Sequence, residues 1–274
     1  NLDINQINER NFLLFSAAAA IITKRKNWEL SLGSMFTSRA PSIEDLYSDG
    51  PHLGVYNYEI GLPELGAEHT YGLEGSLGYM INKAELKITS YQNYSPNYHL
   101  SKVMGAGYEP GADWIEWGSG SAGWLYIYQM SGLEVYIHGY ESEFDYTLND
   151  IISFGGSFSA TRGENLTDNS PLYYMPPDRI ILSTEINLMP FSINLMHKKV
   201  FDQNRIGLYE SATSGYETYN LIGTYTIRNS WVVHKIILQI DNIFDRKYYN
   251  HLSRIKSIMP EKGRNIGLQY RVNF

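Results

Sequence analysis

Residues 71–90 have the sequence YGLEGSLGYMINKAELKITS, and this stretch decides the fold. Its large apolar side chains follow a spacing of two, with small, polar or charged residues between them: Tyr71, Leu73, Leu77, Tyr79 and Ile81, then Leu86 and Ile88. A period of two is that of a β-strand, in which successive side chains point to opposite faces. The polar pair Asn82-Lys83 separates the two runs. The stretch therefore predicts two strands joined by a tight turn.

The same alternation recurs along the chain and predicts about eleven strands. The expected strands cover residues 11–23, 27–36, 70–81, 85–89, 124–146, 152–160, 179–188, 191–195, 219–227, 236–244 and 266–274. The first is ambiguous, because both of its faces are apolar and Ala17–Ala20 favour a helix. We expect an all-β chain with one uncertain element at its start.

The connections between these strands alternate in length. Short ones, such as Lys24–Lys26 and Met189-Pro190, follow long ones, such as Arg39–Glu68 and Tyr248–Gly263. All long connections then lie at one end of the sheet, as in outer-membrane barrels with tight periplasmic turns and long external loops. A soluble sandwich also alternates, but its strands are usually about five or six residues long. The longer segments here favour an antiparallel transmembrane β-barrel.

Composition excludes several other classes of protein. The 274 residues include no cysteine, which removes disulfide scaffolds, Cys-zinc modules and Cys nucleophiles, and the net charge of −7 argues against nucleic-acid binding. The longest apolar stretch, Phe12–Ile22, falls short of the roughly 20 residues of a membrane-crossing helix. No nucleophile–base spacing and no GxSxG, HExxH or GxxxxGK[ST] motif occurs, so we expect no enzyme. The 23 tyrosines suit the aromatic belts of a membrane protein.

The strand count also indicates whether these residues could form a closed barrel by themselves. If the loop Tyr248–Gly263 is external, the last strand descends and Phe274 ends at the periplasmic rim. Counting back, the first of eleven strands also descends, whereas single-chain bacterial barrels have an even number of strands. Two open edges would leave backbone groups unpaired in hydrocarbon. We therefore expect a part of a larger barrel.

Three motifs resemble those of TonB-dependent outer-membrane receptors, in the order that the family has them. The first is Ser38–Tyr47 followed by Asp49–Leu53 and Tyr58–Gly61, the second is Asp241–Tyr249, and the third is the C-terminal signal for the barrel-assembly machinery at Gly267, Tyr270, Val272 and Phe274. The resemblance implies that residues 1–274 are the C-terminal half of a barrel of about 22 strands. One departure is Leu62–Glu68, which lacks the asparagine that the family usually has there, so this loop is expected to diverge.

The resemblance implies a bacterial outer-membrane receptor that imports a scarce nutrient: a metal chelate, a siderophore, haem or zinc. No tightly bound cofactor is expected beyond the transported ligand. Expected partners are outer-membrane lipids and lipopolysaccharide, the barrel-assembly machinery, the missing N-terminal strands and plug, and TonB acting through that plug. The sequence leaves open whether a surface lipoprotein also caps the barrel. The alternative is a plugless fragment that serves as a structural, adhesion or partner-binding subunit.

Two loop regions supply candidate ligand-binding residues. His52, with Asp49 and Glu44 nearby in sequence, has the imidazole and carboxylates that suit a metal or haem, although a solvated loop histidine is the simpler interpretation. In the second long loop, Tyr108, Trp114 and Trp117 stand among glycines and could grip a siderophore or sugar, or else pack on their own loop. Lumen-facing acids such as Glu74 and Asp241 are expected to form a hydrated wall.

Overall fold

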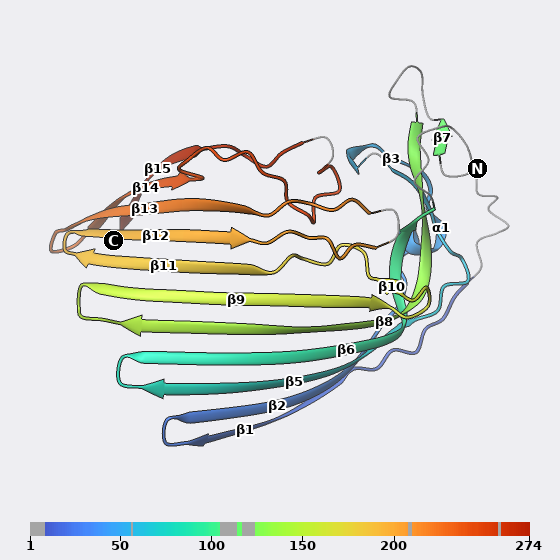
Figure 1. Ribbon diagram of the computed structural model, residues 1–274, viewed down its shortest axis with the longest axis horizontal. Helices are drawn as coiled ribbons and strands as arrows, with labels where there is room; N and C mark the ends of the chain where they lie inside the picture. Colours follow the sequence, from blue (N-terminus) through green and yellow to red (C-terminus); the bar gives the residue numbers. More distant parts are fainter. Residues whose placement is uncertain (1–8, 56, 105–113, 117–123, 208–209, 257–258) are drawn as a thin grey trace.

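Eleven strands form one continuous antiparallel path in the computed structural model, which describes residues 9–55, 57–104, 114–116, 124–207, 210–256 and 259–274 (Figure 1). In spatial order they are β1 (Ala17–Arg25), β2 (Trp28–Arg39), β5 (Glu68–Ile81), β6 (Ala84–Val103), β8 (Trp124–Thr147), β9 (Ile152–Asn165), β11 (Arg179–Leu188), β12 (Phe191–Val200), β13 (Tyr216–Arg228), β14 (Val233–Asp241) and β15 (Asn265–Asn273). The sheet is curved but not closed. The predicted eleven-strand sheet is confirmed.

The first element is a strand rather than a helix. β1 pairs with β2 along its whole length, from Ala17 opposite Phe36 to Arg25 opposite Trp28. An alanine run has high helix propensity, but pairing with a neighbouring strand overrides that preference. β1 begins at Ala17, six residues later than the expected Asn11. The described residues contain no helix long and apolar enough to cross a membrane.

The two ends of the sheet differ as predicted (Figure 1). At one end the strands are joined by tight turns, where Lys26 and Asn82 have φ values of 54° and 49°. Those left-handed conformations close two-residue hairpins. At the other end lie the long connections, with the short helix α1 (Ile43–Tyr47), the 3-10 turn η2 (Leu53–Val55) and the short strands β3 (Asp49–His52), β4 (Asn57–Ile60), β7 (Trp114–Glu116) and β10 (Ser170–Pro171). We refer to this end as the extracellular rim.

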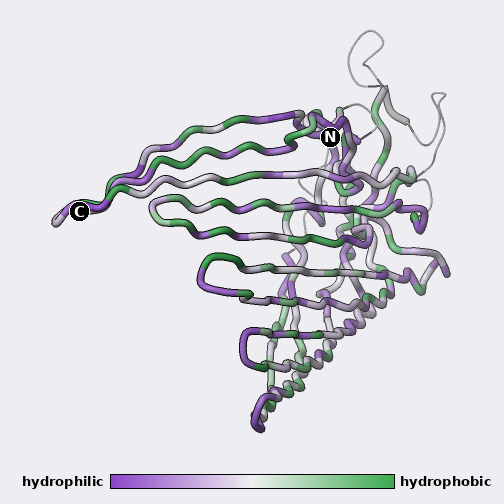
Figure 2. The backbone as a smooth tube through the Cα atoms, turned by 60° about the vertical axis from the view of Figure 1, so that its left-hand side comes forward, coloured by the Kyte–Doolittle hydropathy of each residue, from purple (hydrophilic) through white to green (hydrophobic). Residues whose placement is uncertain are grey.

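The strand register places apolar side chains beside one another on one face. Leu30 lies opposite Leu77, which lies opposite Ile88, and the last strands align Leu238 with Leu268. Figure 2 shows the alternation of hydrophobic and hydrophilic residues along each strand. These side chains are half-exposed or exposed, for example Leu268 at 75%. A wide apolar surface of this kind is the lipid-facing side of a barrel.

Aromatic rings border this apolar surface at both ends. Near the tight turns, Trp28 stacks against Tyr79 with ring centroids 4.3 Å apart, and Phe191 lies 4.8 Å from Tyr225. Near the extracellular rim the ring contacts are Phe36–Tyr71, Tyr71–Tyr94 and Tyr219–Phe244. Rings with an apolar body and a polar edge collect where hydrocarbon meets water. The two belts therefore mark the two membrane boundaries.

The opposite face is lined by small and polar residues. Glu29, Glu74 and Glu185 alternate with the lipid-facing residues of their strands, as expected for a hydrated wall. On this face Tyr91 of β6 lies over Gly139 of β8, and its hydroxyl is 2.7 Å from the hydroxyl of Thr161 on β9. The missing side chain of Gly139 allows one tyrosine to connect three strands.

One strand of the structure ends earlier than the sequence pattern predicts. The penultimate strand was expected to reach Phe244, but β14 stops at Asp241 because Asn242 has a φ of 50°. The Asn242 side chain accepts from the backbone N–H of Arg246 and donates to its carbonyl, both at 2.9 Å. Asparagine tolerates this left-handed conformation better than most residues. The turn after β14 is thus fixed by a local side-chain bridge.

We expect Gly139→Ala to destabilise the sheet. A Cβ at this position would lie 2.5 Å from Cζ of Tyr91 and 2.7 Å from the carbonyl oxygen of Ala160, so the tyrosine must move. Overpacking of this kind costs about 1–3 kcal/mol. The measurement is the temperature at which the folded barrel loses its compact electrophoretic migration. The matched control is Gly223→Ala, where a Cβ meets nothing within 4 Å, and an equal loss in both variants would contradict the role of Tyr91.

Candidate functional site at the extracellular rim

The first long loop folds onto itself before it reaches the rim. Ser42 caps α1 reciprocally with Asp45, each side chain accepting from the other's backbone N–H. Gly61 packs against the end of the helix so closely that a Cβ would lie 2.5 Å from the carbonyl carbon of Leu46, which is buried. The capping sequence and the glycine together hold α1 against the β3–β4 hairpin.

This hairpin then joins the main sheet in an unexpected way. β4 pairs in parallel with β8, with Asn57 opposite Tyr126 and Ile60 opposite Gln129. β8 extends past the end of β9, whose pairing with β8 stops at Val135. An unpaired strand edge is a liability that a loop can cover. The loop between β2 and β5 therefore crosses β6 to protect the upper edge of β8.

The segment that departs from the family pattern is firmly anchored. Leu65 is buried, and the carbonyl of Gly66 lies 2.8 Å from Nε2 of His99 and accepts from Nδ2 of Asn97 at 3.1 Å. The carboxylate of Glu68 accepts from Arg39 at 2.9 Å and from the backbone N–H of His99 at 2.8 Å. These bonds fix Leu62–Glu68 to β2 and β6 without the usual asparagine.

The structure separates the candidate residues of the first loop. Nδ1 of His52 lies 3.1 Å from Oε1 of Glu59, its neighbour across the hairpin. Asp49 instead accepts a 2.7 Å hydrogen bond from the hydroxyl of Tyr58, and this bond is the main reason why the pKa of Tyr58 is raised. Glu44 lies in the first turn of α1. In the described part of the chain, no group of three or more His, Asp or Glu side chains could hold a metal ion.

The aromatic candidates of the second loop are only partly described. Tyr108 and Trp117 lie outside the described residues. The backbone of Trp114 belongs to β7 and pairs with Tyr126 of β8. Their expected role in gripping a ligand stays a prediction.

A site that the sequence did not indicate centres on Arg254, in the loop between β14 and β15. Its guanidinium carbon lies 5.4 Å from the ring centre of Tyr174 and 6.0 Å from that of Tyr128. Its Nη1 is 3.8 Å from Oε1 of Glu59. The two tyrosine hydroxyls are 3.4 Å apart, and burial raises the pKa of Tyr174. Three loops and the top of β8 therefore meet at one arginine.

A buried ionic cluster joins the loop of Arg254 to the loop between β12 and β13. Oε1 of Glu210 lies 3.0 Å from Nε2 of His251 and 3.5 Å from Nζ of Lys256, and the side chains of Glu210 and His251 are 4% and 1% exposed. Nδ1 of His251 is 2.9 Å from the hydroxyl of Thr213. Glu210 also accepts from the backbone N–H groups of Gly207 and Tyr174. The cluster ties the loop after β12 to the loops before and after it.

Burial and charge oppose each other in this cluster. Burial on its own would raise the pKa of the Glu210 carboxyl, but the bonds from His251 and Gly207 and the nearby Lys256 outweigh it and lower that pKa. Burial lowers the pKa of Lys256, although Glu210 partly counteracts the effect. Glu210 is therefore held as a carboxylate, and its charge is part of what orders the loops.

The chemistry of the rim is that of a recognition surface. The guanidinium of Arg254 forms only the 3.8 Å ion pair with a carboxylate among the described residues, and its side chain is 37% exposed. Its donors are therefore available to an anionic ligand, and two tyrosine rings lie within about 6 Å of the guanidinium. Glu59 lies 3.1 Å from His52, so the histidine that the sequence analysis singled out lies next to this site.

The chain is similar to a known family of proteins and to several solved structures. A family model described as "TonB dependent receptor-like, beta-barrel" matches residues 18–243. Among solved structures, the copper transporter OprC aligns with a TM-score of 0.74 at 20% identity, covering 94% of this chain and 38% of that one.

Two further structures align over a similar span. The ferric enterobactin receptor PfeA of Pseudomonas aeruginosa, in complex with enterobactin, has a TM-score of 0.66 at 18% identity and covers 94% and 40% of the two chains. The FrpB iron transporter of Neisseria meningitidis has a TM-score of 0.63 at 14% identity and covers 92% and 38%. At these identities the likeness shows the fold alone. The chain spans about two-fifths of the length of each of these structures.

We expect acid to destabilise the loops at the rim by protonating the carboxylate of Glu210. Because its pKa in the folded chain lies below its ordinary value of 4.5, its contribution to loop stability is present above that value and is lost as the pH falls through the folded pKa. We expect amide hydrogen exchange in residues 210–215 and 248–256, corrected for intrinsic rates, to accelerate as the pH falls below 4.5 and through the lowered pKa of Glu210. In Glu210→Gln these segments should exchange fast at neutral pH as well. Unchanged protection in that variant would contradict the charge-based role.

Proposed function

The chain belongs to the TonB-dependent receptor-like β-barrel family, a family of bacterial outer-membrane proteins rather than enzymes, and on this premise we propose that it serves a receptor that imports a scarce nutrient. Residues 1–274 would be the C-terminal portion of the barrel. The nutrient would be a metal chelate, a siderophore, haem or zinc. The observation that carries the proposal is the Arg254 site at the extracellular rim.

Chelates of metal ions commonly carry negative charge at their carboxylate or phenolate groups, and many contain planar rings. Arginine binds such anions through paired N–H donors, and tyrosine rings stack on planar groups. Arg254, Tyr128 and Tyr174 offer this combination within about 6 Å of one another. The structurally similar proteins support the same class, since they are a copper transporter, a ferric enterobactin receptor and an iron transporter.

Several partners follow from this proposal. The remaining barrel strands and a plug would complete the pore, and TonB would act through that plug. The barrel-assembly machinery would recognise the C-terminal strand, where Ile266, Leu268 and Tyr270 face outward and Tyr270 lies 2.6 Å from Nδ1 of His234. A direct role of His52 in holding zinc or haem iron is a further proposal, supported by its exposed position beside Glu59.

Uptake should depend on Arg254. The measurement uses cells in which the intact receptor is the only TonB-dependent receptor. Uptake of ferric enterobactin, haemin and zinc is measured separately, and we expect TonB-dependent uptake of one of them. Arg254→Ala should lower the apparent affinity for the transported ligand by about ten- to a hundredfold, because a charge-assisted hydrogen bond contributes about 1.5–3 kcal/mol. Arg228→Ala, at the tight-turn end of β13, is the matched control.

The outcomes separate the receptor from its alternative. If none of the three ligands is taken up in a TonB-dependent way, while the barrel assembles normally in the membrane, the import proposal fails and a structural or partner-binding subunit is favoured. If uptake occurs but Arg254→Ala leaves it unchanged, the proposal of an import receptor is supported and the proposal that Arg254 binds the ligand is wrong.

A further inference from the structure

Two cationic side chains lie side by side on the inner face of the wall, just below the loops of the Arg254 site. β11 begins at Arg179 and β12 ends at Val200, and these two residues lie opposite each other in the sheet. Lys198, two residues before Val200, points to the same face, because side chains alternate along a strand. Arg179 and Lys198 are therefore diagonal neighbours, which in a sheet are separated by about 7–8 Å.

The strand register places both cations on the water-filled side of the sheet. Leu182 and Leu195 belong to the lipid-facing surface and are 50% and 42% exposed. Arg179 lies three residues from Leu182, and Lys198 lies three residues from Leu195. An odd separation along a strand turns a side chain to the opposite face. Both cations therefore face the lumen of the barrel.

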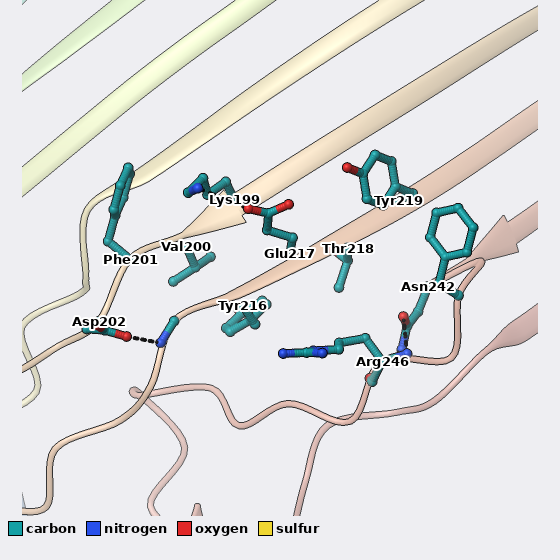
Figure 3. Close-up of a pocket in the computed structure, with 12 residues that line it drawn as sticks. Lys199, Val200, Phe201, Asp202, Tyr216, Glu217, Thr218, Tyr219, Asn242 and Arg246 are labelled. Atoms are coloured by element: carbon teal, nitrogen blue, oxygen red, sulfur yellow. Dashed lines mark hydrogen bonds and ion pairs between the residues drawn. The ribbon is translucent and has the colours of Figure 1, made fainter.

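A hollow of about 590 Å³ adjoins these cations at the upper end of β13. It is lined from both faces of the sheet, because β13 continues beyond its last pair with β14, Leu221 opposite Ile240. Figure 3 shows the two faces: Lys199, Glu217 and Tyr219 lie on one side of the strands, and Val200, Tyr216 and Thr218 lie on the other. Thr218 is directly opposite Lys198, so the inner side of the hollow is next to that lysine.

Two tyrosine rings form the wall beside the cations. The rings of Tyr216 and Tyr248 have centroids 4.2 Å apart, and Nζ of Lys198 lies 5.8 Å from the ring centre of Tyr216. Tyr216 is buried, so its ring gives the lysine a fixed neighbour. The strand ends thus combine cations with a pair of tyrosines, as the loops above them do around Arg254.

The two cations lack a carboxylate partner. Within the described part of the chain neither forms an ion pair, and the only side-chain hydrogen bond that either makes runs from Nε of Arg179 to the hydroxyl of Ser159, at 2.9 Å. Glu261 is close enough to act electrostatically on Lys198, but it does not pair with it. Like charges that are neighbours on one face of a sheet repel each other. An anion between them would remove that repulsion.

A ligand that enters the barrel reaches these cations after it has passed the rim. Arg179, Lys198 and Tyr216 are at the ends of strands, whereas Arg254 lies in a loop above them. The loop between β14 and β15 carries both Arg254 and Tyr248, so one loop contributes to both places. An anion that leaves Arg254 toward the lumen therefore meets Arg179 and Lys198 next.

We propose that Arg179 and Lys198 form a second anion-binding site on the inner wall, below the Arg254 site. Its ligand is a compact group with more than one negative charge. The guanidinium of Arg179 pairs with two oxygens of this group, and the ammonium of Lys198 supplies a further charge. An imported chelate and a free phosphate-type anion both carry such a group. Occupation by a chelate rests on the proposed function, whereas the anion site itself does not.

The test is titration calorimetry of inorganic pyrophosphate with the intact receptor in detergent. All measurements use the Arg254→Ala background, so that the rim site does not contribute. We expect Arg179→Gln and Lys198→Gln each to weaken binding at least about tenfold, because each removes a charge-assisted contact. Arg179→Lys, which keeps the charge without the planar fork, should be intermediate. The matched control is Lys199→Gln, which removes a charge from the outer face of the same strand and should change nothing.

Two competitors separate the sources of the anion. Displacement of pyrophosphate by the trianionic chelate ferric enterobactin, but not by the uncharged chelate ferrichrome, supports occupation by an imported chelate. Displacement by neither supports a free phosphate-type anion as the ligand. If pyrophosphate binds as expected but the cells import no chelate, the proposed function is wrong and the inner-wall site is still supported.

Two results would overturn the proposal. One is that the Arg254→Ala receptor does not bind pyrophosphate. The other is that Arg179→Gln and Lys198→Gln bind it as tightly as Lys199→Gln does. The first measurement needs no change in the inner wall, so it decides the question even if Arg179→Gln fails to assemble.

Discussion

Backbone pairing in hydrocarbon is the constraint on which this structure depends. An unpaired amide or carbonyl costs several kcal/mol inside a bilayer, so each crossing strand must be bonded along its length to its neighbours. The continuous ladder from β1 to β15 meets this requirement through the lipid-facing band, except at the outer edges of β1 and β15, because the sheet is not closed. Side-chain alternation follows from the same ladder, because a shift of one residue would turn every leucine of a strand toward the water-filled side.

The requirement for backbone pairing in hydrocarbon ends at the extracellular rim. There, neighbouring strands end at different heights. β8 rises above β9 and β13 rises above β14, and each leaves a free edge. The two edges are treated differently. Strand β4 covers that of β8 by parallel pairing, whereas the turn held by Asn242 covers only the base of the edge of β13. The Arg254 site lies beside the uneven edge of β8, where strand pairing no longer dictates which residues are allowed.

Arginine has a central position in the candidate site at the rim. Arg254 lies within about 6 Å of the rings of Tyr128 and Tyr174, and the buried Glu210–His251 pair joins its loop to the loop between β12 and β13. Several loops must therefore be ordered before the site exists. The site responds to anything that loosens these loops, such as acid.

The sequence by itself determined the strand count, the lipid-facing residues and the division into a turn end and a loop end, because these follow from a local period of two and from loop lengths. It placed the end of the penultimate strand at Phe244, whereas β14 ends at Asp241. Only the tertiary structure decided that Arg254 meets Glu59, Tyr128 and Tyr174 and that His251 is buried against Glu210. These residues come from loops with no periodicity, and their partners lie far apart in the chain. The positions of the strand ends and the curvature of the sheet decide which of these residues meet. No local pattern in the sequence records these two features.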